Sequence, residues 1–210
     1  MPPLPIRWPS SRGGAGAVPG RWVIVDLETT GLNPRRDELL AIAAVAVRGT
    51  RVSVGDSFEI RVRPRVASDR ENILVHGIGA EAQLSAVDPA VACERFVGYV
   101  GDSPLAAFHA PFDREVLSRA MRAHRIRFPN PWLDIADLAP ALLPKLSADT
   151  LDEWLAHLGI TPRRRHDAAS DAFATASLFA CLLEQAPPAE RGPAGLAAIA
   201  RRFQAARQGT

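Results

Sequence analysis

Cysteine, lysine and long apolar runs are all scarce in this chain of 210 residues. Its 2 cysteines are too few for a disulfide-rich mini-protein. Cys93 and Cys181 lie among apolar residues with no recognisable spacing, so we interpret both as reduced core thiols of a cytosolic protein. No apolar run reaches about 18 residues, which predicts that no segment spans a membrane. The N-terminus also lacks the apolar segment of a secretory signal.

What is present is an ordinary globular composition with an uneven charge. Hydrophobic residues make up 47% and charged residues 23%, which excludes a wholly disordered chain and a fibre. The net charge of +2 is not shared evenly, because residues 1–20 and 186–210 are basic and residues 21–185 are slightly acidic. An acidic middle is a poor footprint for nucleic acid unless bound cations neutralise some of its carboxylates.

Composition divides the chain into three parts. Residues 1–20 are rich in Pro, Gly and Ser, and we expect a flexible N-terminal arm there. Residues 21–185 form the predicted folded domain, which is a usual length for one domain. Residues 186–210 are a basic tail rich in Pro, Ala and Arg, in which 194–207 suit one short helix with a thin apolar face.

The periodicity of apolar residues predicts an α/β fold with a mixed sheet. Strands are expected at 22–28, 38–49 and 51–64, with Gly49 and Thr50 forming the turn of an antiparallel meander. Strand and helix then alternate. The further strands are expected at 103–110 and 132–135, and the helices at 88–100, 111–124, 149–158 and 166–184.

Two carboxylates stand at the end of the first apolar strand. The spacing of Asp26 and Glu28 places both side chains on one face of the strand, and Leu27 points into the core. Two like charges repel each other, and burial increases the cost. Either they mark an ordinary bend at a strand end, or a divalent cation with hard oxygen ligands lies between them.

Three further polar residues follow predicted elements. Asp113 opens a helix after a strand, where capping alone would explain it. Asp171 lies on an otherwise apolar helix, with His166 five residues before it. Five residues on a regular helix place two side chains about 140° apart, so they converge only if His166 lies in the loop that precedes the helix. The neighbouring Asp167 is the acid expected to be exposed.

Together these residues form an ordered set of three motifs, VDLETTGL (25–32), HAPFD (109–113) and HDAASDA (166–172). In that order they resemble the DEDDh branch of the DEDD exonuclease superfamily, which includes the proofreading subunit of bacterial replicative polymerase and ribonuclease T. VHGI (75–78) is similar to a further family segment. The resemblance covers residues 21–185 and implies a ribonuclease H-like fold, with a mixed five-stranded sheet flanked by helices.

The resemblance implies a 3′–5′ exonuclease that uses two divalent cations, Mg²⁺ or Mn²⁺. In this scheme Asp26 bridges both cations, Glu28 and Asp171 hold the one that activates water, and Asp113 supports the other. His166 takes the proton from the attacking water. Histidine suits that role because its unperturbed pKa is about 6.5.

The same resemblance implies a set of substrate contacts. The backbone amides that follow the acidic pair hold the terminal nucleotide, and Leu32 either wedges against the last base or belongs to the core. The implied substrate-binding residues are Thr29, Thr30, Gly31, Leu32, His76, His109 and Phe112. The arginines at 163–165 either meet phosphates or form an ordinary solvated loop. One departure is that Phe108 and His109 stand where the family often has His-Asn.

Several functions remain open from the sequence. The leading hypothesis is an active exonuclease on DNA, with a single-stranded nucleic acid bearing a free 3′ end as substrate, a DNA polymerase as a possible partner and no membrane association. An enzyme that trims RNA or short oligoribonucleotides is a second. A non-catalytic polymerase-associated module that binds nucleic acid is a third, and the intact acidic set speaks against it. An unrelated metal-dependent phosphatase would need a different arrangement of its acids.

Overall fold

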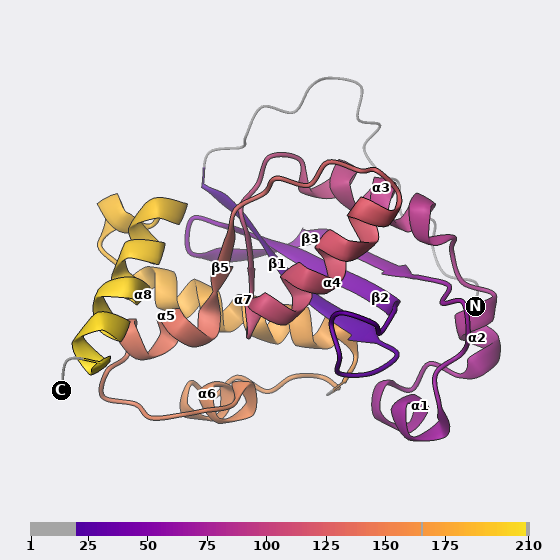
Figure 1. Cartoon of the computed structure of the whole chain (residues 1–210). Coiled ribbons are helices and arrows are strands. Elements are labelled where there is room, and N and C mark those ends of the chain that lie inside the picture. The colour runs from indigo at the N-terminus through magenta and orange to yellow at the C-terminus, as the bar shows by residue number, and fades with distance from the viewer. Residues whose placement is uncertain (1–19, 165, 209–210) are drawn as a thin grey trace.

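A computed structural model describes residues 20–164 and 166–208. The arm expected for residues 1–20 therefore lies, except for Gly20, outside the described residues. The described chain is a five-stranded sheet with helices on both faces (Figure 1). This is the mixed sheet that the sequence predicted.

The sheet combines a meander with two parallel strands. β1 (Arg21–Thr29) pairs antiparallel with β2 (Leu39–Arg48), which pairs antiparallel with β3 (Arg51–Arg61). β4 (Leu105–Ala107) runs parallel to β1 on its other side, and β5 (Trp132–Asp134) runs parallel to β4. The resulting order β3-β2-β1-β4-β5 places β1 at the centre, buried along most of its length.

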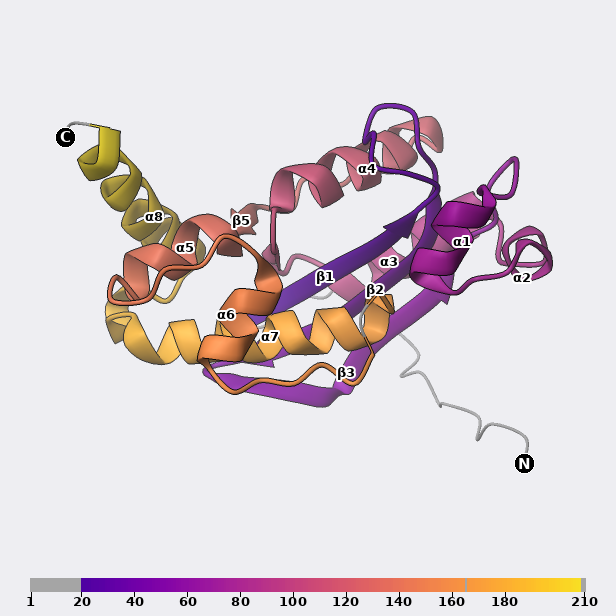
Figure 2. The same cartoon turned by 90° about the horizontal axis from the view of Figure 1, so that it is seen from below.

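Each face of the sheet packs against its own group of helices (Figure 2). α3 (Pro89–Val100) and α4 (Ala110–Ala123) cover one face. α7 (Ala168–Gln185) lies along the other, together with α5 (Ile135–Leu142) and α6 (Leu151–His157). β1 contributes side chains to a hydrophobic core on each face of the sheet. Val23 and Val25 pack toward α3 and α4, whereas Trp22 and Ile24 pack toward α7.

Four helical segments were not clear from apolar periodicity. α1 (Arg70–His76) and α2 (Ala80–Leu84) are short and lie beside the end of the meander, and η1 (Pro188–Glu190) is a single turn. α5 was missed because it follows β5 directly and contains Pro140, which usually ends a helix. The strand expected at 103–110 is also wrong in extent, because the chain turns at His109 and α4 begins at Ala110.

The C-terminal segment packs more closely than its thin apolar face suggested. α8 (Pro193–Gln208) contacts α5 and β5, and its Leu196, Ile199 and Ala200 are buried in the core that contains α7. These apolar side chains are buried because α8 packs against both α5 and the edge strand β5. Residues 193–208 therefore extend the folded unit as a helix.

The described residues include no helix long and apolar enough to cross a lipid bilayer. Cys93 is buried and Cys181 is half-buried, and both are free thiols. Burial raises the pKa of the Cys93 thiol to about 11, so this group stays protonated at neutral pH. Both cysteines thus behave as small core residues.

Candidate active site

The central strand presents two carboxylates to the face covered by α7. Asp26 and Glu28 continue the side-chain series of Trp22 and Ile24, which pack in the core with α7. Both acids are half-buried. Their partners on β2 are Ala43 and Ala41, which are both buried. The strand thus brings two acids to one side of its carboxyl end, as their spacing predicted.

The start of α7 adds a third carboxylate and the histidine. Asp171 is 5% exposed in the first turn of the helix. His166 lies before the helix with φ 59°, an uncommon left-handed conformation, and its backbone N–H donates to Asp171 Oδ2 at 2.9 Å. The loop therefore folds back so that His166 and Asp171 are neighbours. Asp167 is half-buried and caps the helix by accepting from the Ser170 N–H at 3.1 Å.

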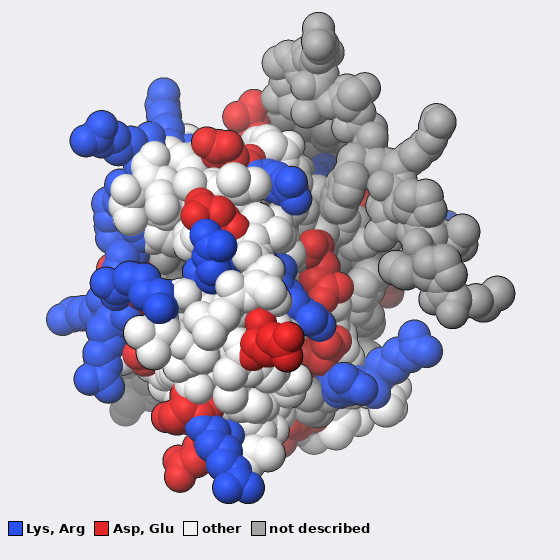
Figure 3. All heavy atoms as spheres, turned by 90° about the vertical axis from the view of Figure 1, so that its right-hand side faces the viewer, with Lys and Arg blue, Asp and Glu red and all other residues white. Residues whose placement is uncertain are grey.

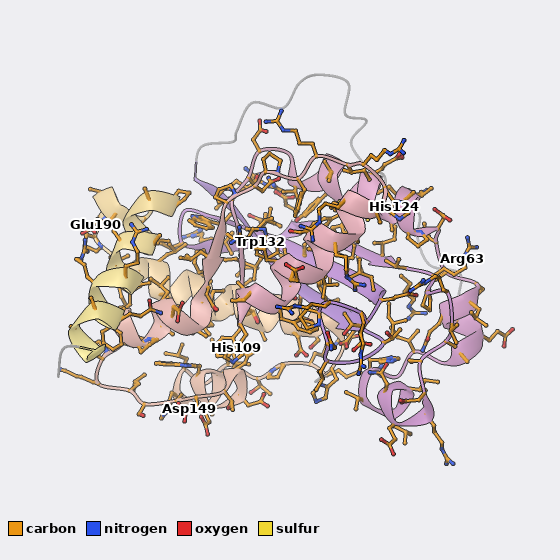
Figure 4. All side chains as sticks on the ribbon, viewed as in Figure 1. Arg63, His109, His124, Trp132, Asp149 and Glu190 are labelled. Carbon is orange, nitrogen blue, oxygen red and sulfur yellow. The ribbon has the colours of Figure 1, made fainter. Side chains whose placement is uncertain are left out.

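The fourth carboxylate comes from the turn between β4 and α4. His109 has φ 62° and is the N-cap of α4, and Figure 4 labels it at the start of that helix. Asp113 then lies in the first turn and is 7% exposed. Burial, with the nearby charges of Asp134 and Glu28, raises its pKa to about 8. Asp113 is thus close enough to Glu28 of β1 for their charges to interact.

Asp134 is a residue of this region that sequence analysis missed. It ends β5 opposite Ala107, and its Oδ1 accepts from the N–H groups of His109 (3.0 Å) and Ala136 (2.9 Å). One carboxylate oxygen thereby caps α5 and holds the turn that leads to Asp113. The only signal in the sequence was an Asp at the end of a short predicted strand, which is also an ordinary capping position.

The segment after Glu28 forms a tightly hydrogen-bonded loop. Thr29 Oγ1 donates to the Gly31 carbonyl at 2.6 Å, and Thr30 and Glu38 exchange two hydrogen bonds of 2.9 Å. A Cβ at Gly31 would lie 2.5 Å from Asp37 Oδ2, so any other residue would require the Asp37 side chain to move. Leu32 is 92% exposed. It is therefore not part of the core, which removes one of its two interpretations.

The remaining predicted substrate contacts, His76, His109 and Phe112, differ in how far they are buried. His76 is buried; its Nδ1 accepts from the Ile78 N–H at 2.9 Å and its Nε2 lies 2.8 Å from Asn72 Oδ1. Burial lowers the pKa of His76, so the ring is neutral. His109 is exposed and Phe112 is half-buried. The substrate contacts of these residues stay predictions.

Charge is mixed on the face that carries α1 and α2, where basic and acidic side chains are interspersed (Figure 3). Arg163 and Arg164 are exposed in the loop before α7, and position 165 is not described. Arg164 donates its backbone N–H to Ser170 Oγ at 2.9 Å. Because basic and acidic side chains are interspersed on this face, nucleic acid would bind there only at local clusters of positive charge.

The donor set fits divalent cations. Four carboxylates come from one strand end and two helix starts, and hard oxygen ligands of this kind suit Mg²⁺ or Mn²⁺. The pKa of Asp113 is raised mainly by burial and to a lesser extent by the negative charges of Asp134 and Glu28, which a cation would offset. Within residues 20–164 and 166–208, no three acidic, His or Cys side chains lie close enough to hold an ion as they stand.

Comparison with known proteins gives a family match over most of the chain. Residues 23–179 match the model of the family RNase_T, described as exonuclease. A DNA polymerase III subunit epsilon-like protein of Rhodobacter capsulatus is 37% identical over 167 residues, 77% of this chain and 23% of that protein. A DNA polymerase III PolC-type of Thermotoga maritima is 31% identical over 164 residues, 78% of this chain and 12% of that protein. The chain thus spans less than a quarter of either relative's length.

Solved structures share the fold. Exonuclease I of E. coli, in complex with a dA16 oligonucleotide, aligns with a TM-score of 0.67 and 20% identity, over 79% of this chain and 42% of that chain. Cell-death related nuclease 4 aligns with a TM-score of 0.69 and 17% identity, over 79% of this chain and 64% of that chain. These alignments and the family match confirm the fold and the family expected from the three sequence motifs.

Proposed function

Since the chain belongs to the RNase_T exonuclease family, we propose that it hydrolyses the 3′-terminal phosphodiester of single-stranded nucleic acid and releases nucleoside monophosphates. The observation that carries this proposal is the contact of α4 and α7 with β1, which brings the acid-bearing segments of the three motifs to the central strand and puts Asp113 within charge interaction of Glu28. An acidic set with a histidine beside it suits metal-assisted hydrolysis. A binding module would not need it.

The cations are held, in this proposal, by Asp26, Glu28, Asp113 and Asp171. Bound there, they supply a more acidic water and neutralise charge that develops on the phosphate. The protein adds His166 as the group that takes the proton from the attacking water. The hydrogen bond from the His166 N–H to Asp171 sets the distance between that base and the carboxylates. The loop from Thr29 to Gly31, which directly follows the β1 acids, is proposed to contact the terminal nucleotide; the Thr30 N–H already donates to the Glu38 carbonyl at 2.9 Å and is not one of those contacts.

Cation binding should depend steeply on pH because of Asp113. Its raised pKa, about 8, means that the buried carboxyl is mostly protonated at pH 6.5, and a cation must displace that proton. We therefore expect Mn²⁺ affinity, measured by titration calorimetry on the free protein, to rise about tenfold per pH unit up to pH 8 and then level off. The change runs in this direction because the deprotonated form is the one that binds.

The Asp113→Asn variant is the control for that titration. It should bind Mn²⁺ more weakly at pH 8, and its affinity should change little between pH 6.5 and pH 8. A wild-type affinity that stays constant over this range would show that Asp113 is already ionised and would contradict its assigned environment.

DNA is the proposed substrate, and two comparisons support it. The Rhodobacter and Thermotoga relatives are named for DNA polymerase III, and the Exonuclease I structures include complexes with dA16 and dT13 oligonucleotides. We propose Mg²⁺ or Mn²⁺ as the cation; Exonuclease I has also been solved with zinc and single-stranded DNA. Association with a DNA polymerase is a further part of the proposal and rests on the relatives' names alone.

The proposal is tested with single-stranded DNA and RNA of the same sequence, labelled at the 5′ end. We expect a ladder of products shortened from the 3′ end, with Mg²⁺ or Mn²⁺ and not with EDTA, and faster on DNA. A faster reaction on RNA would select the RNA-trimming alternative. Absence of products from both would contradict the proposed activity.

A further inference from the structure

A hollow opens on the side of α4 that faces β5 and α8. It is a groove of about 500 Å³ between α4, the β5–α5 segment and α8. In Figures 1 and 2, β5 lies between α4 and α8, so the groove joins the fold's edge strand to its last helix. Trp132 of β5, labelled in Figure 4, lines it together with Ala197 and Ala200 of α8. We call it the α4–α8 groove.

The walls of the α4–α8 groove carry exposed arginines. Arg114 and Arg122 come from α4, and Arg201 comes from α8. Arg122 lies 3.4 Å from Glu115, a weak surface ion pair. The half-exposed Trp132 and the two alanines give the floor an apolar area. Guanidinium groups above an aromatic and apolar floor suit a nucleic acid strand, whose phosphates and bases bind such groups without regard to sequence.

Two of the three acids that line the groove are engaged with the protein itself. Glu115 faces Arg122, and Asp134 accepts two backbone N–H groups through one oxygen. Asp137 stands in the first turn of α5, where the helix dipole stabilises a negative charge. Among the described residues, neither Arg114 nor Arg201 forms an ion pair with a carboxylate, and both are exposed.

The groove begins at the edge of the candidate active site. Asp134 lines it and holds the His109 N–H, and Arg114 directly follows Asp113. Its other wall, α8, begins at residue 193 and so lies beyond residues 23–179, which match the family. The groove is therefore a feature that this chain builds with its own C-terminal helix.

We propose that the α4–α8 groove binds the nucleotides upstream of the scissile bond, with Arg114 and Arg201 contacting their phosphates. This inference rests on the proposed exonuclease function for the direction of the strand. The proposal gives α8 a role in substrate binding. It also predicts that longer single strands bind more tightly than a dinucleotide does. A strand of two nucleotides ends before the groove, whereas one of 12 nucleotides occupies it.

The test measures binding and hydrolysis separately. Binding of a fluorescent single-stranded 12-mer is followed by anisotropy in EDTA, where no hydrolysis occurs. We expect the double variant Arg114→Ala/Arg201→Ala to bind the 12-mer about tenfold more weakly than wild type. Each lost phosphate contact lowers the slope of log affinity against log salt by about 0.7, so the slope should fall by about 1.4. Hydrolysis is then measured with Mn²⁺ present. The double variant should have a higher KM for the 12-mer than wild type has. Its kcat and its KM for a dinucleotide should be unchanged.

The matched control is Arg51→Ala/Arg95→Ala, which also removes two exposed arginines but from β3 and α3. It should bind the 12-mer as wild type does. Equal loss in both double variants, or none in the groove variant, would overturn the proposal, as would a wild-type protein that does not bind the 12-mer at 50 mM salt. Normal length-dependent binding without any hydrolysis would instead overturn the proposed function and leave the groove assignment standing.

Discussion

Asp171→Asn is expected to lower nucleotide release by more than about 10³-fold, a loss of about 4 kcal/mol of transition-state stabilisation. Asparagine is nearly isosteric with aspartate, and its carbonyl oxygen can still accept the His166 N–H that Asp171 Oδ2 accepts at 2.9 Å. The loop before α7 should therefore keep its shape. What is lost is the negative charge that helps to hold a cation. Initial rates with labelled single-stranded DNA at saturating Mn²⁺ measure the effect.

Stability separates this effect from misfolding. Because Asp171 is 5% exposed near other acids, removing its charge should leave the free energy of unfolding unchanged or higher, as measured by urea denaturation. Asp102→Asn, an exposed acid after α3, serves as the matched control and should retain full activity. An Asp171→Asn protein that is folded and still active would show that the cation assignment is wrong.

His166→Ala is expected to lower the rate by about 10²–10⁴-fold while Mn²⁺ affinity stays close to that of wild type. The rate falls and the Mn²⁺ affinity does not, because in this proposal His166 accepts a proton from the attacking water and does not bind the cation. Its left-handed backbone at φ 59° and its N–H bond to Asp171 place it next to the carboxylates, with the side chain exposed toward solvent. Rates and calorimetric Mn²⁺ titrations on the same preparations make the comparison.

Added imidazole provides a further check on His166. A small diffusible base should restore part of the rate in His166→Ala if the missing group is a base, and it should not affect Asp171→Asn. His124→Ala is the control, because His124 is an exposed histidine at the opposite end of α4 from His109 (Figure 4). A His166→Ala protein that loses Mn²⁺ binding would make His166 a ligand instead.

Much of the fold followed from the sequence because its strongest signals are local. β1 and β2 are nearly continuous buried runs, and the turn at Gly49 joins two clear strands, so the meander was predicted. α5 and α8 were harder. Pro140 argues against a helix, and the few apolar residues of α8 gain their role only by meeting α5. Such packing between distant segments leaves little trace in local periodicity.

The candidate site was also only partly predictable from the sequence, because some of its contacts join segments that are far apart in the chain. Asp26 and Glu28 were recognisable because charges interrupt an apolar strand, and the three motifs set Asp113, His166 and Asp171 beside them. Asp134 carried no such signal, since an acid at a strand end before a helix is ordinary capping. Its link to the His109 N–H appears only when β4 and β5 lie side by side.

The central claim is that Asp26, with the acids from α4 and α7, holds the cations on which hydrolysis of the 3′ end depends. The most direct test follows release of the 3′-terminal nucleotide from 3′-labelled single-stranded DNA by wild type and Asp26→Ala, across a Mn²⁺ titration and in EDTA. We predict cation-dependent release by wild type, none in EDTA, and none by a folded Asp26→Ala at any Mn²⁺ concentration. Release by Asp26→Ala at the wild-type rate, or release by wild type in EDTA, would contradict it.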